Sequence, residues 1–374
     1  MNISILSVGP PYRGGISEQT FHLYSKLDKS HNVQLINFSR QYPEILFPGK
    51  SQVDLDSDLS IANNHMLIDS INPISWISSS NLILESSPDM IVMRFWNPFF
   101  ALAHGFIVRR IKKKNPNVKI VAVCDNIIPH ERRFLDKLLT KYLFNSIDGF
   151  IVMADGVEQE LFEIVDKPKY KKVFHPVSFK NSAMAKSNAR SRLNIKNEKI
   201  ILFFGFIREY KGLDVLIKSS KYLKQKLKDY KIIVCGESYE GERKYLKLIE
   251  EHSNEGNIEW INDYIGDDLA RIYFSACDVV VLPYKSASQS GVIPLSYSYN
   301  KPVIASNITG IKAMVSHGNT GFLFNKNDEK DLSNKIISFF NSDINYEQNI
   351  KEFKKQFSWD EFINKIFELY KEID

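Results

Sequence analysis

The chain has 374 residues, 44% hydrophobic and 25% charged, which favours two globular domains and argues against wholesale disorder. A net charge of +5 suits an anionic ligand or surface, but it is no signature of nucleic-acid binding. Three isolated cysteines (Cys124, Cys235 and Cys277) argue against a disulfide framework or zinc site and favour a reducing cytoplasm. No apolar run approaches the roughly 20 residues needed to span a bilayer, and the opening residues predict a strand and no signal peptide.

Short apolar runs of strand length recur along the chain. Most are near-continuous, as expected for parallel strands covered on both faces. Helix-length amphipathic segments, such as residues 17–27 and 360–373, lie between them. This alternation predicts doubly wound α/β structure. The predicted strands are residues 3–8, 32–38, 90–96, 118–124, 149–154, 199–205, 230–236, 278–283 and 301–306.

The strand series stops and restarts in the middle of the chain. Residues 180–198, KNSAMAKSNARSRLNIKNE, are polar and lack strand character, which predicts an interdomain linker with the boundary near residue 185. Residues 39–80 are polar and without clear pattern, which predicts a long irregular loop that shapes a substrate pocket. Two such domains create a cleft, and ligands of parallel sheets bind at the carboxyl ends of the strands.

The strand KIILFF ends at Gly205 and is followed by a short charged turn that carries Arg208 and Lys211. An apolar helix face starts at Leu213. Two cations beside a helix start make an anion site, because the free N–H groups and the helix dipole add to their charge. A solvated turn is an equally good interpretation of these residues alone.

The strand DVVVLP leads into a serine-rich loop and then GVIPLSYSY. Ser290 is the predicted N-cap of a helix, and Gly291 allows a ligand to approach. The amides of Gly291, Val292 and Ile293 would then be free to hold a phosphate. The alternative is an ordinary capped helix.

The first predicted strand is followed by GPPYRGGISEQ, in which Gly14 and Gly15 precede a helix. The pattern is not GxGxxG, so a dinucleotide fingerprint is absent. The two glycines let a ligand come close to the backbone, or they form a plain turn. Glu237 directly follows the strand at residues 230–236 and is assigned to donor binding.

The strand VKIVAVC ends in DNIIPHERR, which places Asp125, Asn126, His130 and Glu131 at a strand end. Polar, titratable groups in a cleft are candidates for catalysis or for binding an acceptor. A structural role for the histidine is the alternative.

Five segments, taken in order, resemble the family-4 retaining glycosyltransferases of the GT-B architecture. GFIREYKGLDVLI looks like the family's G-x-x-x-x-x-K-G-x-D-x-L-I element, with Lys211, Gly212 and Asp214 on its marked positions. Residues 125–157 are similar to the branch that assembles bacterial surface polysaccharides. The other resembling segments are 9–16 (the glycine loop), 290–324 (the donor loop with the next strand, helix and glycine-rich turn) and 357–370 (a helix that crosses back onto the first domain).

The resemblance implies two Rossmann-like parallel-sheet domains facing across a cleft. Residues 1–184 plus 358–374 would form the acceptor-binding domain, and residues 185–357 the nucleotide-sugar-binding domain. The implied activity is transfer of a sugar from a UDP- or GDP-sugar to a hydroxyl of a saccharide or lipid-linked acceptor, with retained configuration. Lys211 would hold the leaving diphosphate, and the amides at Gly291 and Val292 would do likewise.

The predicted site residues fall into three groups. The catalytic group is Asp125, His130, Arg208 and Lys211. The donor-binding group is Gly14, Gly15, Gly205, Glu237, Ser290, Gly291 and Val292. The acceptor-binding group is Asn126 and Glu131.

Three departures from the family pattern bear on these assignments. The arginine that follows the glycine of the first element is replaced by Phe206, and Arg208 would supply the charge. The two glutamates around the donor loop fall on Ala287 and Leu295, and neither is acidic. Asp125 stands where the family has a histidine, with His130 close behind.

No metal or other cofactor is expected, because lysine and arginine can neutralise the diphosphate. Asp54, Asp56 and Asp58 form an Asp-x-Asp spacing, which we interpret as a solvated acidic loop. Basic and apolar residues at 108–119 and 131–144 would suit an anionic membrane surface on the inner face of the cell membrane, or they are ordinary amphipathic helices. No nucleic-acid partner is expected.

Two rival functions remain open. A sugar-nucleotide epimerase of the same fold would interconvert free nucleotide sugars without an acceptor. A nucleotide-sugar binder that has lost catalysis is motivated by the missing glutamates and histidine.

Overall fold

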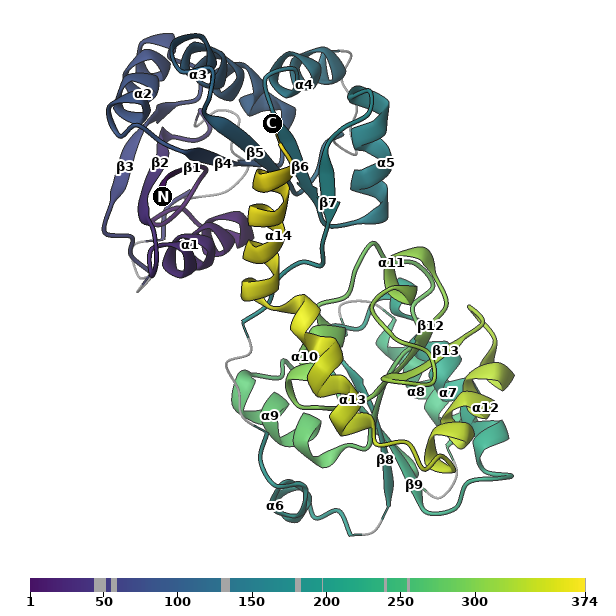
Figure 1. Ribbon diagram of the computed structural model, residues 1–374. Coiled ribbons are helices and arrows are strands. Elements are labelled where there is room, and N and C mark those ends of the chain that lie inside the picture. Colours follow the sequence, from purple (N-terminus) through teal and green to yellow (C-terminus); the bar gives the residue numbers. More distant parts are fainter. Residues whose placement is uncertain are drawn as a thin grey trace. The chain divides into compact units, whose positions relative to one another are not determined.

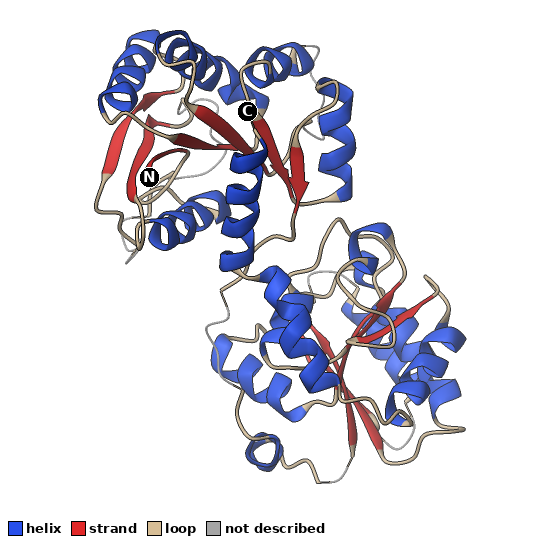
Figure 2. Cartoon of the chain, viewed as in Figure 1, coloured by secondary structure: helices blue, strands red, loops and turns tan. Residues whose placement is uncertain are grey.

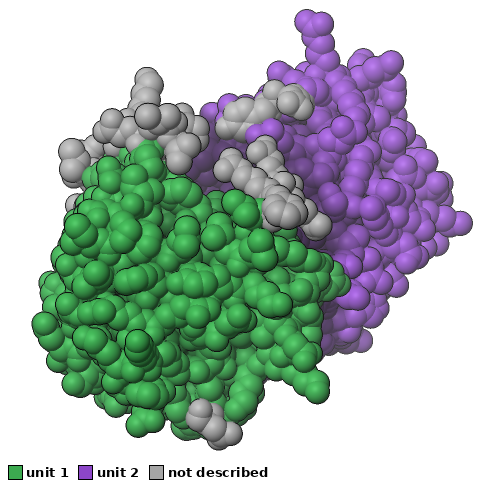
Figure 3. All heavy atoms as spheres, turned by 90° about the horizontal axis from the view of Figure 1, so that it is seen from above, with its two compact units in different colours: residues 1–176, 358–374 green, residues 177–357 purple. Residues whose placement is uncertain are grey.

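The computed structural model describes residues 1–43, 52–54, 59–128, 135–178, 183–196, 198–238, 241–253 and 256–373. His130, Glu131, Asp56 and Asp58 therefore lie outside the described residues. The chain divides into two compact units, residues 1–176 with 358–374 and residues 177–357, which are coloured separately in Figure 3. The predicted boundary near residue 185 lies a few residues further along the chain.

Unit 1 contains, within its described residues, one seven-stranded sheet with the order β3-β2-β1-β4-β5-β6-β7 (Figure 1). All neighbouring strands run parallel. The strands are β1 (Asn2–Leu6), β2 (Asn32–Arg40), β3 (Asn64–Asp69), β4 (Met90–Phe95), β5 (Lys119–Cys124), β6 (Gly149–Val152) and β7 (Tyr170–Lys172). The helices are α1 (Gly15–Leu27), α2 (Pro73–Glu85), α3 (Ala101–Lys114), α4 (Asp136–Phe144), α5 (Asp155–Ile164) and α14 (Trp359–Glu372).

The sheet of unit 1 is covered on both faces. One core contains apolar residues of α2, α3, α4 and α5. The other is closed by α1 and α14, and from α14 it includes Trp359, Phe362 and Ile366. The near-continuous apolar runs of the inner strands follow from this burial, because helices lie on both faces of the sheet (Figure 2).

Residues 39–80 are not the patternless loop that the sequence predicts, because β3 and most of α2 lie within them. The strand β3 is at the edge of the sheet, so it lacks a continuous apolar run. The helix α2 is rich in serine, and Ser79 and Ser80 donate hydrogen bonds of 2.8 Å to carbonyl groups of their own helix, of Ser75 and Ile77. Because their hydroxyl groups are hydrogen-bonded within the helix, these serines can be buried. The serine-rich composition therefore hides a buried helix face.

Unit 2 contains a parallel sheet that has six strands in the described residues, with the order β10-β9-β8-β11-β12-β13. The strands are β8 (Lys199–Phe204), β9 (Tyr230–Cys235), β10 (Ile258–Ile261), β11 (Val279–Leu282), β12 (Val303–Ser306) and β13 (Gly321–Phe324). The helices are α6 (Lys186–Arg192), α7 (Leu213–Leu223), α8 (Glu242–His252), α9 (Asp267–Ala276), α10 (Val292–Ser298), α11 (Thr309–Lys312), α12 (Glu329–Phe340) and α13 (Tyr346–Phe353).

The strand order of unit 2 reverses between β8 and β11, which is where ligands of doubly wound sheets bind. The segment 180–198, predicted to be a linker without structure, contains α6. Arg190 of this helix donates to the carboxylate of Asp278 at 2.9 Å, so this part of the segment packs on unit 2.

The turn from β8 into α7 depends on Gly212. Its φ is 68°, and a Cβ at this position would lie 1.9 Å from the carbonyl oxygen of Pro283. A side chain is therefore excluded both by backbone conformation and by the neighbouring loop. This glycine fixes the path of the chain immediately after Lys211.

We expect Gly212→Ala to lower the free energy of unfolding by roughly 3 kcal/mol or more, because the strained φ and the backbone clash act together. Gly291→Ala is the matched control: its φ is −68° and nothing lies within 4 Å of an added Cβ. The control should change stability by about 0.5 kcal/mol or less. Urea denaturation of both variants checks this, and equal midpoints would contradict the role given to Gly212.

Candidate active site

The site starts where β8 and β9 end in glycine. Gly205 follows β8 with φ 102°, and Gly236 follows β9 with φ 152°. A Cβ at Gly236 would lie 2.2 Å from the carbonyl oxygen of Gly205, so the two turns approach more closely than side chains permit. The amide of Ile207 donates to the carbonyl of Glu237 at 2.8 Å, which joins the two loops beyond the strands.

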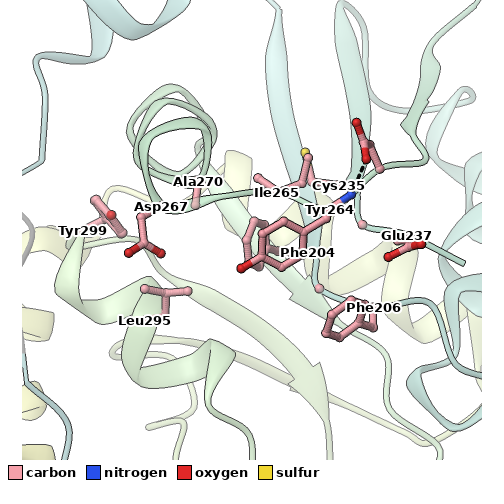
Figure 4. Close-up of a pocket in the computed structure, with 13 residues that line it drawn as sticks. Phe204, Phe206, Cys235, Glu237, Tyr264, Ile265, Asp267, Ala270, Leu295 and Tyr299 are labelled. Atoms are coloured by element: carbon pink, nitrogen blue, oxygen red, sulfur yellow. Dashed lines mark hydrogen bonds between the residues drawn. The ribbon is translucent and has the colours of Figure 1, made fainter. Parts of the chain in front are cut away.

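A hollow of about 240 Å³ opens at these strand ends (Figure 4). Its apolar walls include Phe204, Phe206, Tyr264, Leu295 and Tyr299. The ring centroids of Phe206 and Tyr264 lie 6.3 Å apart, and the ring planes are tilted by 33°. Walls of this kind suit a planar, partly apolar group.

Three carboxylates, Glu237, Asp263 and Asp267, also line this hollow, whereas no lysine or arginine does so among the described residues. We call it the carboxylate-lined hollow. Asp267 stands in the first turn of α9, where its negative charge interacts favourably with the positive end of the helix dipole. Carboxylates that line a site accept hydrogen bonds from hydroxyl or amino groups of a ligand.

Lys211 lies beside the carboxylate-lined hollow, over the turn at Gly205. Its Nζ is 3.0 Å from the position that a Cβ on Gly205 would occupy. The side chain is half-buried, and within the described part of the chain no carboxylate forms an ion pair with it. Burial lowers the pKa of Lys211, and the positive charge of Arg208 lowers it further. Among the described residues, this ammonium group at a strand end thus has no counter-charge.

Lys285 provides the contrast to Lys211. Its Nζ lies 3.0 Å from the carboxylate of Asp214, the acidic residue of the K-G-x-D element. One lysine near this turn is therefore neutralised within the protein, whereas the other has no ion-pair partner among the described residues.

The two predicted strand ends of unit 2 come together. The same Cβ position on Gly205 lies 3.9 Å from Cγ2 of Val292. Lys211 and the start of α10 therefore both lie next to the turn at Gly205. The helix begins one residue later than predicted, with Gly291 as N-cap and no side-chain capping bond. Ser290 is buried, and its Oγ accepts a hydrogen bond of 3.2 Å from the amide of Val292.

The prediction that the Val292 amide is free is therefore wrong. The Ser290 hydroxyl also hydrogen-bonds the side chain of Tyr284, whose pKa burial raises to about 12. Ser290 thus joins the loop after β11 to the first turn of α10.

In unit 1, Asp125 is held by a buried arginine. Arg94 of β4 is 2% exposed and Asp125 is 10% exposed. Nε of Arg94 donates to one carboxylate oxygen at 3.1 Å, and Nη2 donates to the other. His175 lies near this pair, and its pKa is lowered by burial and then by Arg94, with Asp125 opposing. Asn126, the next residue, is exposed.

Arg94 and His175 were missed by the sequence analysis. Arg94 carried a signal, because a single charge inside the apolar run MIVMRFW needs a buried partner. His175 carried none, since it stands alone in a short irregular segment. Glu160 of α5 was also missed; its carboxylate accepts from the amides of Ile127 and Ile128, at 3.3 and 3.0 Å, and so orients the loop after Asp125.

Gly14 and Gly15 line a separate hollow of about 280 Å³ in unit 1, together with Tyr12 and Asp54. Arg13 lies 3.8 Å from Asp54. In the described residues no group of three or more histidine, cysteine, aspartate or glutamate side chains is arranged to hold a metal. No helix in the described ranges is long and apolar enough to cross a membrane.

Comparison with known proteins agrees with this geometry. Residues 185–357 match the family described as Glycosyl transferases group 1. The fold is GT-B. An uncharacterized glycosyltransferase of Methanocaldococcus jannaschii is 28% identical over 385 residues, covering 100% of this chain and 99% of the relative. Residues 185–357 thus form a glycosyl transferase group 1 domain.

Two solved structures illustrate the likeness in fold. Lipopolysaccharide outer core galactosyltransferase WaaB, in its apo form, has a TM-score of 0.68 at 14% identity, covering 98% of this chain and 99% of that chain. HepE of Anabaena, in complex with UDP, has a TM-score of 0.66 at 16% identity, covering 98% of both chains.

We expect Asp125→Ala to lower the free energy of unfolding by about 3–5 kcal/mol, because it leaves the buried guanidinium of Arg94 without a counter-charge. Asp360→Ala is the control, since its pair with Lys26 is at the surface, with Asp360 75% exposed. The control should cost about 0–1 kcal/mol. Chemical denaturation measures both, and a small loss in Asp125→Ala would contradict a structural role for the Arg94 pair.

We expect Lys211→Met to raise the stability of the group 1 domain at about pH 7, since it removes an ammonium group that is desolvated and repelled by Arg208. Burial and Arg208 lower the pKa of Lys211 in the folded protein, so the penalty is fully present at pH values below that folded-state pKa. It fades as the pH rises toward 10.5 and the folded protein releases the proton.

Urea midpoints measured from about pH 7 to pH 10 check this prediction. Lys218→Met, a partly exposed lysine on α7, is the control for the change in side chain. A Lys211→Met protein less stable than the wild type at neutral pH would contradict the prediction.

Proposed function

We propose that the protein is a family-4 retaining glycosyltransferase that transfers a sugar from a UDP- or GDP-sugar to a hydroxyl of a saccharide or lipid-linked acceptor, in surface-polysaccharide or glycan assembly. The observation that carries the proposal is the half-buried Lys211 ammonium, which lacks an ion-pair partner in the described residues and lies over Gly205 beside a hollow at the strand ends.

The proposed donor lies with its nucleoside in the carboxylate-lined hollow and its diphosphate toward Lys211. The aromatic walls would pack against the base, and the carboxylates would accept from its polar groups or from the ribose. Structures of HepE with UDP and with UDP-glucose support a nucleotide-sugar ligand for this fold. A volume of about 240 Å³ suits part of such a ligand.

The proposed chemistry is electrostatic. Breaking a glycosyl–diphosphate bond places negative charge on the leaving oxygens, so a fixed cation binds the transition state more strongly than the ground state. Lys211 is the group that would supply this cation, with Arg208 near it. Two cations take the place of a divalent ion, and we therefore propose that the reaction is independent of metal.

Unit 1 is the proposed acceptor side, with Asn126 and Glu131 as binding residues and His130 in the role of the family's histidine. Because Asp125 is paired with Arg94, we propose that Asp125 positions the segment that follows it and begins at Asn126. We further propose a cytoplasmic enzyme that attaches reversibly to an anionic membrane.

The support for membrane attachment is reduced by contacts of α3. Arg109 donates to the carbonyl of Tyr142 at 2.7 Å, and Lys112 donates to Asp148 at 2.8 Å. Lys113 and Lys114 are exposed. The ion pair with Asp148 thus neutralises Lys112, whereas Arg109 keeps its charge at the surface.

One observation favours the alternative functions. Leu295, which stands where the family has a glutamate, is apolar and lines the carboxylate-lined hollow. A site without the family's glutamates could bind a nucleotide sugar and epimerise it, or bind it only. Both alternatives share the donor site and differ in what happens without an acceptor.

We expect one member of a panel of UDP-, GDP- and ADP-sugars to stabilise the protein by about 2.7 kcal/mol at a hundred times its dissociation constant, measured by thermal shift. With that donor, Lys211→Ala should lose about 3 kcal/mol of transition-state stabilisation, roughly a hundredfold or more in turnover. Lys218→Ala is the control variant and should keep its turnover.

Failure of every nucleotide sugar to stabilise the protein would contradict the proposal. Near-normal turnover in Lys211→Ala would remove this lysine from the mechanism. Interconversion of the free nucleotide sugar without any acceptor would replace the transferase by the epimerase.

A further inference from the structure

A second hollow lies at the carboxyl edge of the same sheet, on the other side of the switch between β8 and β11. It measures about 610 Å³ and is formed where β11, β12 and β13 end. None of its lining residues lines the carboxylate-lined hollow. We call it the lysine-lined hollow; it is lined by Lys285, Ser286, Asn307, Thr309, Lys312 and Lys326, with two apolar neighbours.

The charge of the lysine-lined hollow is opposite to that of its neighbour. Each of the three strand ends contributes one lysine, and no lining residue is acidic. Lys285 is paired with Asp214 at 3.0 Å, whereas no ion pair is found for Lys312 or Lys326 among the described residues. Three ammonium groups and one carboxylate leave two positive charges, which match the charge of about −2 on a phosphate monoester.

The backbone around this hollow is fixed by hydrogen bonds. The amide of Lys285 donates to the carbonyl of Tyr210 at 2.6 Å, and the amide of Asn307 donates to the carbonyl of Phe324 at 2.8 Å. A Cβ on Gly310 would lie 2.1 Å from the carbonyl oxygen of Ala287, so the loops after β11 and β12 are in direct contact. The backbone segments that carry the lysines are therefore joined to one another and to the neighbouring strands, while Lys312 and Lys326 themselves are exposed.

We propose that the lysine-lined hollow is a second anion site, which binds a phosphate group of a ligand other than the sugar donor. Ammonium groups, the hydroxyls of Ser286 and Thr309 and the side-chain amide of Asn307 are the donors that phosphate oxygens accept from. The phosphate is either a free inorganic anion or the phosphate ester of a second substrate. In the second case the inference rests on the proposed transferase and names the class of its acceptor.

The test uses the full-length protein with Lys211→Ala as background, so that the cation beside the carboxylate-lined hollow does not contribute. Inorganic phosphate and glycerol 3-phosphate are titrated, with binding followed by phosphorus NMR. We expect K312Q/K326Q to weaken phosphate binding about tenfold or more, because two charge-assisted contacts are lost. K226Q/K228Q is the matched control, since both lysines are exposed and precede β9 at the opposite edge of the sheet.

The two probes separate the sources of the phosphate. Tighter binding of glycerol 3-phosphate would assign the site to a phosphate ester, and binding of the inorganic anion alone would assign it to free phosphate. Unchanged phosphate affinity in K312Q/K326Q, or an equal loss in K226Q/K228Q, would overturn the proposal.

Nucleotides separate this inference from the proposed function. UDP and GDP are titrated on the protein with Lys211 intact, and K312Q/K326Q should change their affinity less than about twofold. A parallel loss of nucleotide and phosphate affinity would make the lysine-lined hollow part of the donor site and would overturn the inference. Lysine-dependent phosphate binding in a protein that binds no nucleotide would support the inference while the transferase fails.

Discussion

The ammonium group of Lys211, half-buried and without an ion-pair partner in the described residues, is the feature on which the proposed chemistry depends. Burial and Arg208 both disfavour its charge, so the folded protein stores an electrostatic cost at the end of β8. Gly212 and Pro283 hold the turn that carries it. In the proposed function, a negatively charged ligand would relieve that cost, which would account for a cation unfavourable for stability at a strand end.

Unit 2 separates opposite charges along one edge of its sheet. Carboxylates line the hollow beside β8 and β9, and lysines line the hollow beyond β11. Lys211 lies next to the first hollow, by the glycine turn. The carboxylates of the first hollow and Lys211 would together orient a ligand with hydroxyl or amino groups at one end and phosphates at the other, which supports a nucleotide bound in a single direction.

The sequence predicts those features that depend on local pattern. The β8 turn is recognisable because Gly205, Lys211 and Gly212 lie within eight positions of one another, and the parallel sheets follow from apolar runs. The Arg94–Asp125 pair could not be predicted, because the register of β4 on β5 brings the two residues together across 31 positions. The bond from the Val292 amide to Ser290 is of the kind that a serine N-cap makes, so the predicted cap at Ser290 already implied that this amide is not free. The lysine-lined hollow unites the segments after three successive strands, and its shape depends on how those segments fold.

A crystal structure of the protein with a bound nucleoside diphosphate tests the central claim most directly. The account predicts the nucleoside between Phe204, Glu237 and Tyr299, and a phosphate oxygen in hydrogen-bond contact with Nζ of Lys211. A nucleotide bound in another place, or a diphosphate that makes no contact with Lys211, would contradict it.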